Sequence, residues 1–288
     1  MKISILLILL IFPLTSIAQA INMGASGNTN KNDSISKQIL EPTKYSITYK
    51  YEYAVDSEYP DDKREGLTLL QIGNRYNRFW DYNEFKSDSI FDRAAKENLT
   101  ITEFSGPVLQ AMRRITFSES ILMDKHSGKE IIQRTAGLPT KKYQYEEVLP
   151  SLKWNLVEGD STIADYHCKK ATTNLFGREY IAWYCPAIDL PYGPYKFNGL
   201  PGLIFKVVDT QNLFNFTIQE IKKENEYHPI YYWTRKDLVK SDRKTIRKIY
   251  KNFCLDPLSS LLSDGNIKVS DKAKAKVKSR PYNPIELE

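Results

Sequence analysis

Apolar and polar residues alternate without a break in KYSITYKYEYAV, residues 44–55. Because successive side chains of a β-strand point to opposite faces, this pattern predicts a strand with one buried face. The side chains on that face are Tyr45, Ile47, Tyr49, Tyr51 and Tyr53. Tyrosine suits half-buried strand faces, and the chain has 19 tyrosines. A strand with one apolar face needs neighbouring strands and a core, so the fold has to be built on a sheet.

The strand pattern recurs along most of the chain, between turn signals rich in Gly, Pro, Asn and Asp. The other segments in which we expect strands are GLTLLQI, RYNRFWDY, RITFSESILMDK, KEIIQRTA, KKYQYEEVL, KWNLVE, LIFKVVD, LFNFTIQEI and PIYYWT. Helical patterns occur near 87–98, a short segment, and near 241–254, where Ser241 is the expected N-cap. The predicted fold is mainly β (β-rich α+β), with a large curved antiparallel sheet or an open barrel or bowl.

The first 20 residues predict a secretory signal peptide. Lys2 precedes an apolar stretch of about a dozen residues, which is too short to span a bilayer. Ala18-Gln19-Ala20 then supplies small residues at cleavage spacing. No cysteine lies near this junction, so we expect an exported protein without a lipid anchor.

The rest of the chain predicts one domain with two polar ends. Residues 21–40 have almost nothing to bury and are expected to form a flexible leader. Residues 41–288 have a length that suits a single β-rich domain. The formal net charge is +6, and its excess lies mostly in the C-terminal third. That third ends in a lysine-rich arm at about 264–288, which we expect to be solvated.

Two of the three cysteines flank a predicted hairpin. In ADYHCKKATTNLFGREYIAWYCP, a two-residue loop at Phe176-Gly177 would place Cys168 opposite Cys185. Directly opposite residues are close enough for a disulfide, and an exported chain meets an oxidising compartment. A longer loop would shift the register and separate them, and two buried thiols are the alternative.

A connection crowded with proline and glycine, residues 186–202, cannot be a strand or a helix. Near its end, Leu200-Pro201-Gly202-Leu203 has the proline and glycine positions of a type II turn. That turn would lead into LIFKVVD, an apolar strand of the kind found in mid-sheet. We interpret this motif as a structural corner; its residues are Gly199, Leu200, Pro201, Gly202, Leu203 and Ile204.

The sequence has no G-x-S-x-G, H-E-x-x-H, P-loop or dinucleotide-binding pattern, and we predict no cofactor and no metal site. His126, His167 and His228 are scattered, and His167 would face away from the adjacent Cys168 on a strand. A carboxylate pair for glycoside hydrolysis is an alternative, with turn caps and solvated strand ends as the other interpretation. The candidate carboxylates are Asp160, Asp165, Glu179, Asp189 and Asp209.

The predicted helix near 241–254 has one apolar and one basic face. The basic residues are Arg243, Lys244, Arg247, Lys248 and Lys251. Such a face could contact an anionic membrane surface, while simple solvation of the basic face is the alternative. Export argues against nucleic acid as a partner.

Residues 177–209 resemble the signature of the GLPGLI family of exported Bacteroidetes proteins. The matching stretch is GREYIAWYCPAIDLPYGPYKFNGLPGLIFKVVD. LTLLQIGNRYNRFWDYNEFKSDSI, WNLVEGDSTIADYHCKKAT and YNPIELE also resemble the family, so the likeness covers most of residues 45–288.

The resemblance implies a β-rich fold and export by a Gram-negative bacterium, hence a place in the periplasm, at the outer membrane or outside the cell. It implies gene neighbourhoods rich in outer-membrane uptake systems, but no established activity and no catalytic residues. The family often has a small residue where Cys185 stands, so the resemblance does not imply a disulfide.

Two function classes follow from these observations. The first is a non-enzymatic envelope module that binds a protein, peptide or lipid partner, because a concave sheet with a rigid rim suits binding. The alternative is an exported hydrolase with carboxylates at the rim of the sheet. An apolar trough would favour the first class, and a polar pocket with two nearby carboxylates would favour the second.

Export predicts a processed amino terminus. Intact-mass analysis of the protein from its native envelope is expected to show a chain that begins at Gln19 or Ile21, without an acyl group. An intact Met1, or a lipid adduct, would contradict this prediction.

Overall fold

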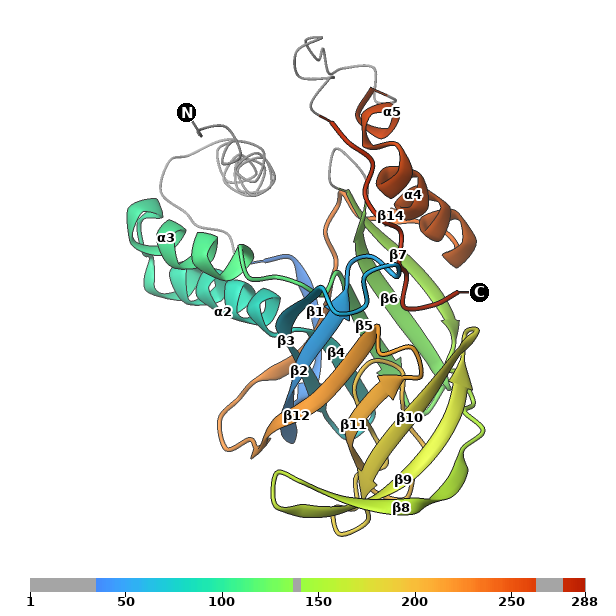
Figure 1. The fold of residues 1–288 in the computed structure, drawn as a ribbon. Helices are drawn as coiled ribbons and strands as arrows, with labels where there is room; N and C mark the ends of the chain where they lie inside the picture. Colours follow the sequence, from blue (N-terminus) through green and yellow to red (C-terminus); the bar gives the residue numbers. More distant parts are fainter. Residues whose placement is uncertain (1–34, 137–140, 263–276, 288) are drawn as a thin grey trace, which may run out of the picture.

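The computed structural model describes residues 35–136, 141–262 and 277–287. Within these ranges the chain forms a sheet of 12 strands, a second sheet of two strands and four helices (Figure 1). The large sheet is curved and open, since its edge strands β8 (Asn155–Ile163) and β14 (Val239–Lys240) lie at opposite ends of the strand order. The predicted mainly β fold with a large sheet is confirmed. The predicted signal peptide and residues 21–34 lie outside the described ranges.

Across the large sheet the strand order is β14-β7-β6-β5-β4-β3-β2-β12-β11-β10-β9-β8. The remaining strands are β2 (Tyr45–Ala54), β3 (Lys63–Ile72), β4 (Tyr76–Asp81), β5 (Glu119–Asp124), β6 (Lys129–Ala136), β7 (Lys141–Val148), β9 (Tyr166–Leu175), β10 (Arg178–Cys185), β11 (Leu203–Asp209) and β12 (Phe214–Lys223). All neighbours are antiparallel except β14, which pairs in parallel with β7. Hairpins therefore explain most of the sheet, and the β2–β12 pair joins its two halves.

The predicted register of the β9–β10 hairpin is correct. Arg178 pairs with Leu175 and Tyr184 with Lys169, and both loop residues have positive φ: 47° at Phe176 and 83° at Gly177. Positive φ at both loop residues is the type I′ geometry that suits the twist of paired strands. The loop accommodates a phenylalanine in the left-handed region, where glycine or asparagine is usual.

The structure does not contain the predicted disulfide. Cys168 and Cys185 are both buried free thiols, and the Cys168 Sγ lies 3.6 Å from the backbone oxygen of Tyr166. The register therefore brings the two strands together as expected, but the thiols behave as small buried apolar groups, the alternative interpretation. Burial raises the pKa of the Cys168 thiol to about 11, which disfavours the reactive thiolate.

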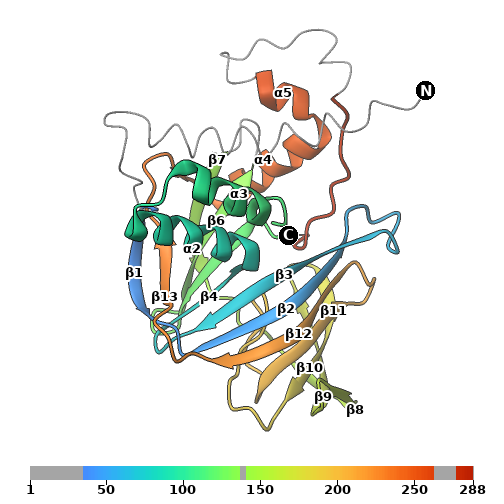
Figure 2. The same cartoon turned by 90° about the vertical axis from the view of Figure 1, so that its left-hand side faces the viewer.

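Two helices follow β4 and lie beside each other (Figure 2). The first, α2 (Tyr82–Glu97), begins earlier than predicted because Asp81 caps it, accepting hydrogen bonds from the backbone N–H groups of Asn83 and Glu84. The second, α3 (Ile101–Met112), was not predicted. Its capping box, Thr100 with Glu103, is the sequence signal for it, but Gly106 and Pro107 interrupt the helical pattern.

Near the C-terminus the helices are α4 (Arg243–Leu255) and α5 (Pro257–Leu262). The predicted helix near 241–254 is thus present, but its N-cap is Asp242 rather than Ser241. The Asp242 carboxylate accepts a hydrogen bond from the Thr245 backbone N–H at 2.9 Å, the bond a cap has to supply. Ile246 and Phe253 are buried, as the apolar face predicts.

The second sheet pairs β1 (Lys37–Pro42) with β13 (Pro229–Trp233) on the outer face of the large sheet, the face opposite its main core. Residues 37–40 of the predicted leader therefore form part of a strand. The side-chain amide of Gln133, on β6, bonds both backbone groups of Trp233, at 2.7 and 3.0 Å. This amide substitutes for a strand neighbour and fixes β13 on the large sheet.

The main core lies on the inner face, where the predicted tyrosine strand places Ile47, Tyr49 and Tyr51. Tyr51 stacks on Phe216 of β12, with ring centroids 4.7 Å apart. The buried hydroxyl of Tyr49 donates a hydrogen bond to the backbone oxygen of Ile204 at 2.8 Å. The first strand recognised in the sequence is thus tied directly to the Gly199–Ile204 motif.

The Gly199–Ile204 motif ends the connection and leads into β11, but its turn differs from the predicted type II turn. Leu200, Leu203 and Ile204 are almost fully buried, and β11 begins at Leu203. A type II turn would bond the N–H of Leu203 to the oxygen of Leu200. Instead the Leu203 N–H donates to Ile188 at 3.0 Å and the Gly202 N–H to Leu200 at 2.8 Å. A three-residue turn around Pro201 therefore replaces the predicted type II turn.

Gly202 has two separate reasons to be glycine. Its φ is +143°, a region that other residues rarely adopt, and a Cβ would lie 2.2 Å from the backbone oxygen of Cys185. Gly202→Ala is therefore expected to lower the free energy of unfolding by about 2–4 kcal/mol, from strain plus displacement of the β10 end. Thermal or urea unfolding of the variant beside the parent measures this loss.

The matched control is Gly106→Ala in α3. A Cβ at Gly106 has nothing within 4 Å, so alanine is expected to be neutral or to stabilise by up to about 1 kcal/mol. Equal stability of the two variants would show that the corner does not constrain the fold.

Candidate functional site

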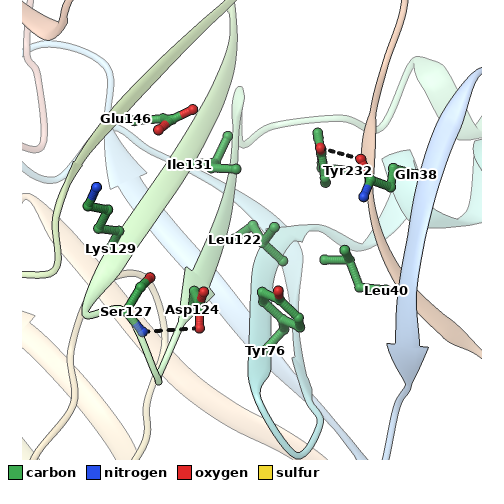
Figure 3. A pocket seen from close by; sticks show the side chains of 10 residues that line it. All are labelled: Gln38, Leu40, Tyr76, Leu122, Asp124, Ser127, Lys129, Ile131, Glu146 and Tyr232. Carbon is green, nitrogen blue, oxygen red and sulfur yellow. Dashed lines mark hydrogen bonds between the residues drawn. The ribbon is translucent and has the colours of Figure 1, made fainter.

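The described part of the chain contains a groove on the outer face, of about 230 Å³, beside β1. Its lining residues, the outer groove, are Gln38, Leu40, Tyr76, Leu122, Asp124, Ser127, Lys129, Ile131, Glu146 and Tyr232. Figure 3 shows Leu40, Tyr76 and Leu122 near its centre, with Lys129 and Glu146 on one side. The groove therefore has an apolar floor and a polar rim.

The rim is partly fixed by internal contacts. Asp124 accepts two hydrogen bonds from Arg75, at 2.9 and 2.6 Å, and others from the backbone of His126 and Ser127. The Arg75 hydrogen bond and these turn contacts outweigh desolvation and hold the pKa of Asp124 well below its ordinary value. Asp124 is therefore ionised, and its carboxylate is occupied by hydrogen bonds from Arg75 and from its own turn. The hydroxyl of Tyr232 donates to Gln38 across the second sheet.

The most unusual polar feature lies on the inner face. Lys196, from the Pro/Gly-rich connection, is fully buried and its Nζ contacts three carboxylates. Glu130 on β6 and Glu147 on β7 are cross-strand partners, and Glu286 comes from the C-terminal segment. The Nζ–oxygen distance is 2.9 Å to both Glu130 and Glu286. One lysine thus connects two strands, the connection before the motif, and the end of the described chain.

Arg243 and Arg247, both on α4, add two more cations beside the Glu286 carboxylate. Both contact the Glu286 carboxylate, at 2.8 and 3.2 Å. We call Glu130, Glu147, Lys196, Arg243, Arg247 and Glu286 the buried charge cluster. The predicted basic face of the helix is therefore divided: these two arginines are half-buried, whereas Lys244, Lys248 and Lys251 are exposed.

Burial and neighbouring charges push the carboxyl pKa values of the cluster apart. Burial raises the pKa of Glu130 to about 8; Lys196 opposes this shift and Glu147 adds to it. Burial alone would also raise the pKa of Glu286, but Lys196, Tyr195 and Arg243 lower it to about 2. Glu130 is therefore protonated at neutral pH, while Glu286 is ionised.

The five predicted candidate carboxylates do not form this cluster. Asp160, Asp165, Glu179 and Asp189 are exposed, on the β8–β9 hairpin, on β10 and in the connection. Asp209 is buried, and its Oδ1 accepts hydrogen bonds from the backbone of Leu213 and Phe214, each at 2.7 Å. These positions match the alternative interpretation, turn caps and solvated strand ends.

The histidines are also dispersed. His126 is exposed in the β5–β6 turn, and His167 lies 3.2 Å from Asp160 at the surface. His228 is half-buried beside Glu224 and Glu226. Among residues 35–136, 141–262 and 277–287, no group of three His, Cys, Asp or Glu side chains has the arrangement of a metal site. In the same ranges, no helix has both the length and the apolar character that a membrane crossing requires.

Two features of the sequence point to the buried charge cluster, but residue spacing alone does not identify the partners. Glu130 and Glu147 occupy inner-face positions of strands, where an apolar residue is expected. Lys196 stands between Tyr195 and Phe197, both buried. A charged residue at an inward strand position requires a partner of opposite charge, which only the tertiary fold identifies.

No protein-family model and no curated protein matches the chain. Two solved structures of PNGF-II, in space groups P21 and C2, are similar to it, with TM-scores of 0.44 and 0.45 and identities of 12% and 13%. The similarity covers 72% of this chain but only 33% and 32% of the PNGF-II chains. This chain therefore spans about a third of their length.

The raised pKa of Glu130 makes the stability of the protein depend on pH. Between its ordinary pKa of 4.5 and about 8, the folded state holds a proton that the unfolded chain releases. The free energy of unfolding is therefore expected to fall as pH rises through this range, by at most about 1.4 kcal/mol per pH unit. In Glu130→Gln this decline should flatten, which urea unfolding at pH 5, 6.5 and 8 measures.

Glu146→Gln is the control, because Glu146 is exposed on the other face of β7. Its pH dependence should follow the parent. An unchanged decline in Glu130→Gln would mean that Glu130 is ionised throughout.

Proposed function

We propose that this chain is an exported envelope protein of the GLPGLI family that acts as a non-enzymatic binding module. The observation that carries the proposal is the outer groove, an apolar trough with a polar rim beside an edge strand. The pattern of residues 1–20 supports export. A place in the periplasm, at the outer membrane or outside the cell, and a link to outer-membrane uptake, rest on the family resemblance.

The size of the groove favours a protein or peptide partner. Small-molecule pockets usually enclose roughly 300–1,000 Å³, and this groove, at about 230 Å³, is smaller and open. A trough of that size suits one or two apolar anchor side chains of a larger partner. The aromatic rings of Tyr76 and Tyr232 offer contact area, and each hydroxyl can bond at the rim.

The strand beside the groove adds a second means of recognition. Within the described residues, β1 has a paired strand on one side only, namely β13. Its other edge offers backbone groups to an extended peptide, as in recognition by strand addition. Gln38 and Leu40 place the side chains of the same strand in the groove. One partner segment could therefore use the backbone edge and the apolar floor together.

The Gly199–Ile204 motif is explained without a reaction. Its glycines provide positive φ, and its apolar residues fill the core. Each of these roles is structural. They support the proposal that the motif serves the fold and does not take part in a reaction.

The alternative is an exported hydrolase, and one observation favours it. Glu130, whose pKa is raised, lies beside Glu147 and Lys196, an arrangement typical of acid–base sites. Glu130 and Lys196 are fully buried, so a substrate would need the C-terminal segment to move first.

Photo-crosslinking in the native envelope tests the binding proposal. Ile131 is replaced by p-benzoylphenylalanine, which places the probe in the groove, and the crosslinked product is identified by mass spectrometry. Leu40→Arg, which introduces a charge on the apolar floor, is expected to reduce the product about tenfold or more. A crosslinked lipid instead of a protein would assign a different partner class.

The control is Ile39→Arg on the adjacent position of β1. Ile39 is 52% exposed and does not line the groove, so crosslinking should persist. Equal products in both variants, or no product at all, would contradict the groove as the binding site. Turnover of an envelope substrate that Glu147→Gln abolishes would support the hydrolase instead.

A further inference from the structure

The C-terminal segment, residues 281–287, lies against the inner face without joining the sheet as a strand. It is contacted largely through its main chain. Arg178 donates hydrogen bonds to the backbone oxygen of Pro284, at 3.2 and 2.9 Å, and Tyr180 donates to that of Ile285 at 3.1 Å. The N–H of Leu287 donates to the Phe176 oxygen at 2.8 Å. Main-chain recognition of this kind suits an extended peptide.

Two side chains of the segment provide the specific contacts. Asn283 accepts a hydrogen bond from Arg178 and donates one to the backbone oxygen of Ala54, both at 2.8 Å. Glu286 places its carboxylate among Lys196, Arg243 and Arg247. The hydroxyl of Tyr195 also donates to Glu286. A half-buried asparagine and a buried glutamate thus occupy two separate recognition points three residues apart.

The charges that receive Glu286 do not depend on it for all their partners. Lys196 contacts Glu130 and Glu147, and Arg243 lies 3.6 Å from Glu147. Lys196 and Arg243 thus keep contacts with carboxyl groups of the sheet that do not involve Glu286. Cations held in place by other groups are preorganised for an anionic ligand.

The receiving residues belong to elements that the sheet and the core position independently. Arg178 and Tyr180 are on β10, Lys196 is in the connection before the motif, and Arg243 and Arg247 are on α4. Arg178 is also fixed by Asp209, at 3.5 Å, and by Gln211. We call Arg178, Tyr180, Lys196, Arg243 and Arg247 the tail site.

We propose that the tail site is a peptide-recognition site for an extended segment with an asparagine and, three residues later, a glutamate, and that residues 281–287 occupy it as a built-in ligand. A partner segment with the same pattern would compete with the chain's own tail. This site is on the inner face and is separate from the outer groove.

The test uses the full chain with a protease recognition sequence inserted between residues 263 and 276, which connect α5 to the tail. After cleavage the tail should remain bound through its own contacts. A fluorescent peptide of residues 279–288, SRPYNPIELE, is then added in excess, and anisotropy measures its exchange into the site. Binding and release of the original tail are the expected result.

Two peptide variants define the specificity. Glu286→Gln removes the charge that the three cations contact and should weaken binding about tenfold or more. Leu287→Ala should bind almost as the parent peptide, because Leu287 is 53% exposed and its backbone N–H, not its side chain, donates the hydrogen bond to Phe176. In the protein, Lys244→Gln is the matched control for Arg247→Gln, since Lys244 is exposed on the same helix.

Three results would overturn the proposal. The first is a cleaved, folded protein that neither retains the tail nor binds the peptide. The second is equal affinity for the parent and Glu286→Gln peptides. The third is loss of the folded circular dichroism spectrum when the tail leaves, because the tail would then be a structural element and not a ligand.

Discussion

The contact of Lys196 with Glu130 and Glu147 across two paired strands is the interaction on which the rest of the structure depends. A buried ammonium group needs acidic partners, and here these lie on β6 and β7, with Glu286 of the C-terminal segment as a third. Because Lys196 precedes the Gly199–Ile204 motif by three residues, the position of that connection is set by the charge contacts at one end and by Gly202 at the other. The inner face is consequently filled by protein rather than left as an open bowl.

The two faces of the large sheet have different physical character. The inner face combines a continuous apolar core with the enclosed contacts among Lys196, Glu130 and Glu147, so changes to these residues are expected to act on folding. The outer face carries an added two-stranded sheet, a groove beside it, and Arg78 stacked 3.4 Å from the ring centroid of Trp80. The proposed partner site is on this outer face, and the built-in peptide is on the inner one.

The alternating pattern predicted most strands because period-two burial is a local property of the chain. The KEIIQRTA and LIFKVVD segments became β6 and β11 with the expected bounds, and the Phe176-Gly177 loop gave the correct hairpin register. The features that sequence reasoning missed depend on distant partners or on competing local signals. Glu286 lies 90 residues beyond Lys196, and Pro107 obscured a helix whose cap was present. The thiols of Cys168 and Cys185 show that a correct register does not by itself form a bond.

The β2–β12 pairing has a consequence for how the molecule folds. Tyr53 pairs with Phe214 and Tyr45 with Lys223, so the two halves of the sheet meet only through contacts between residues far apart in the chain. Loop-closure entropy opposes such contacts, and folding rates fall as the mean sequence separation of contacts grows. One edge of β2 can pair with β3 early, but the other edge stays unpaired until β12 has been made. The unpaired edge of β2 is therefore a site for wrong strand pairing until the two halves of the sheet have joined.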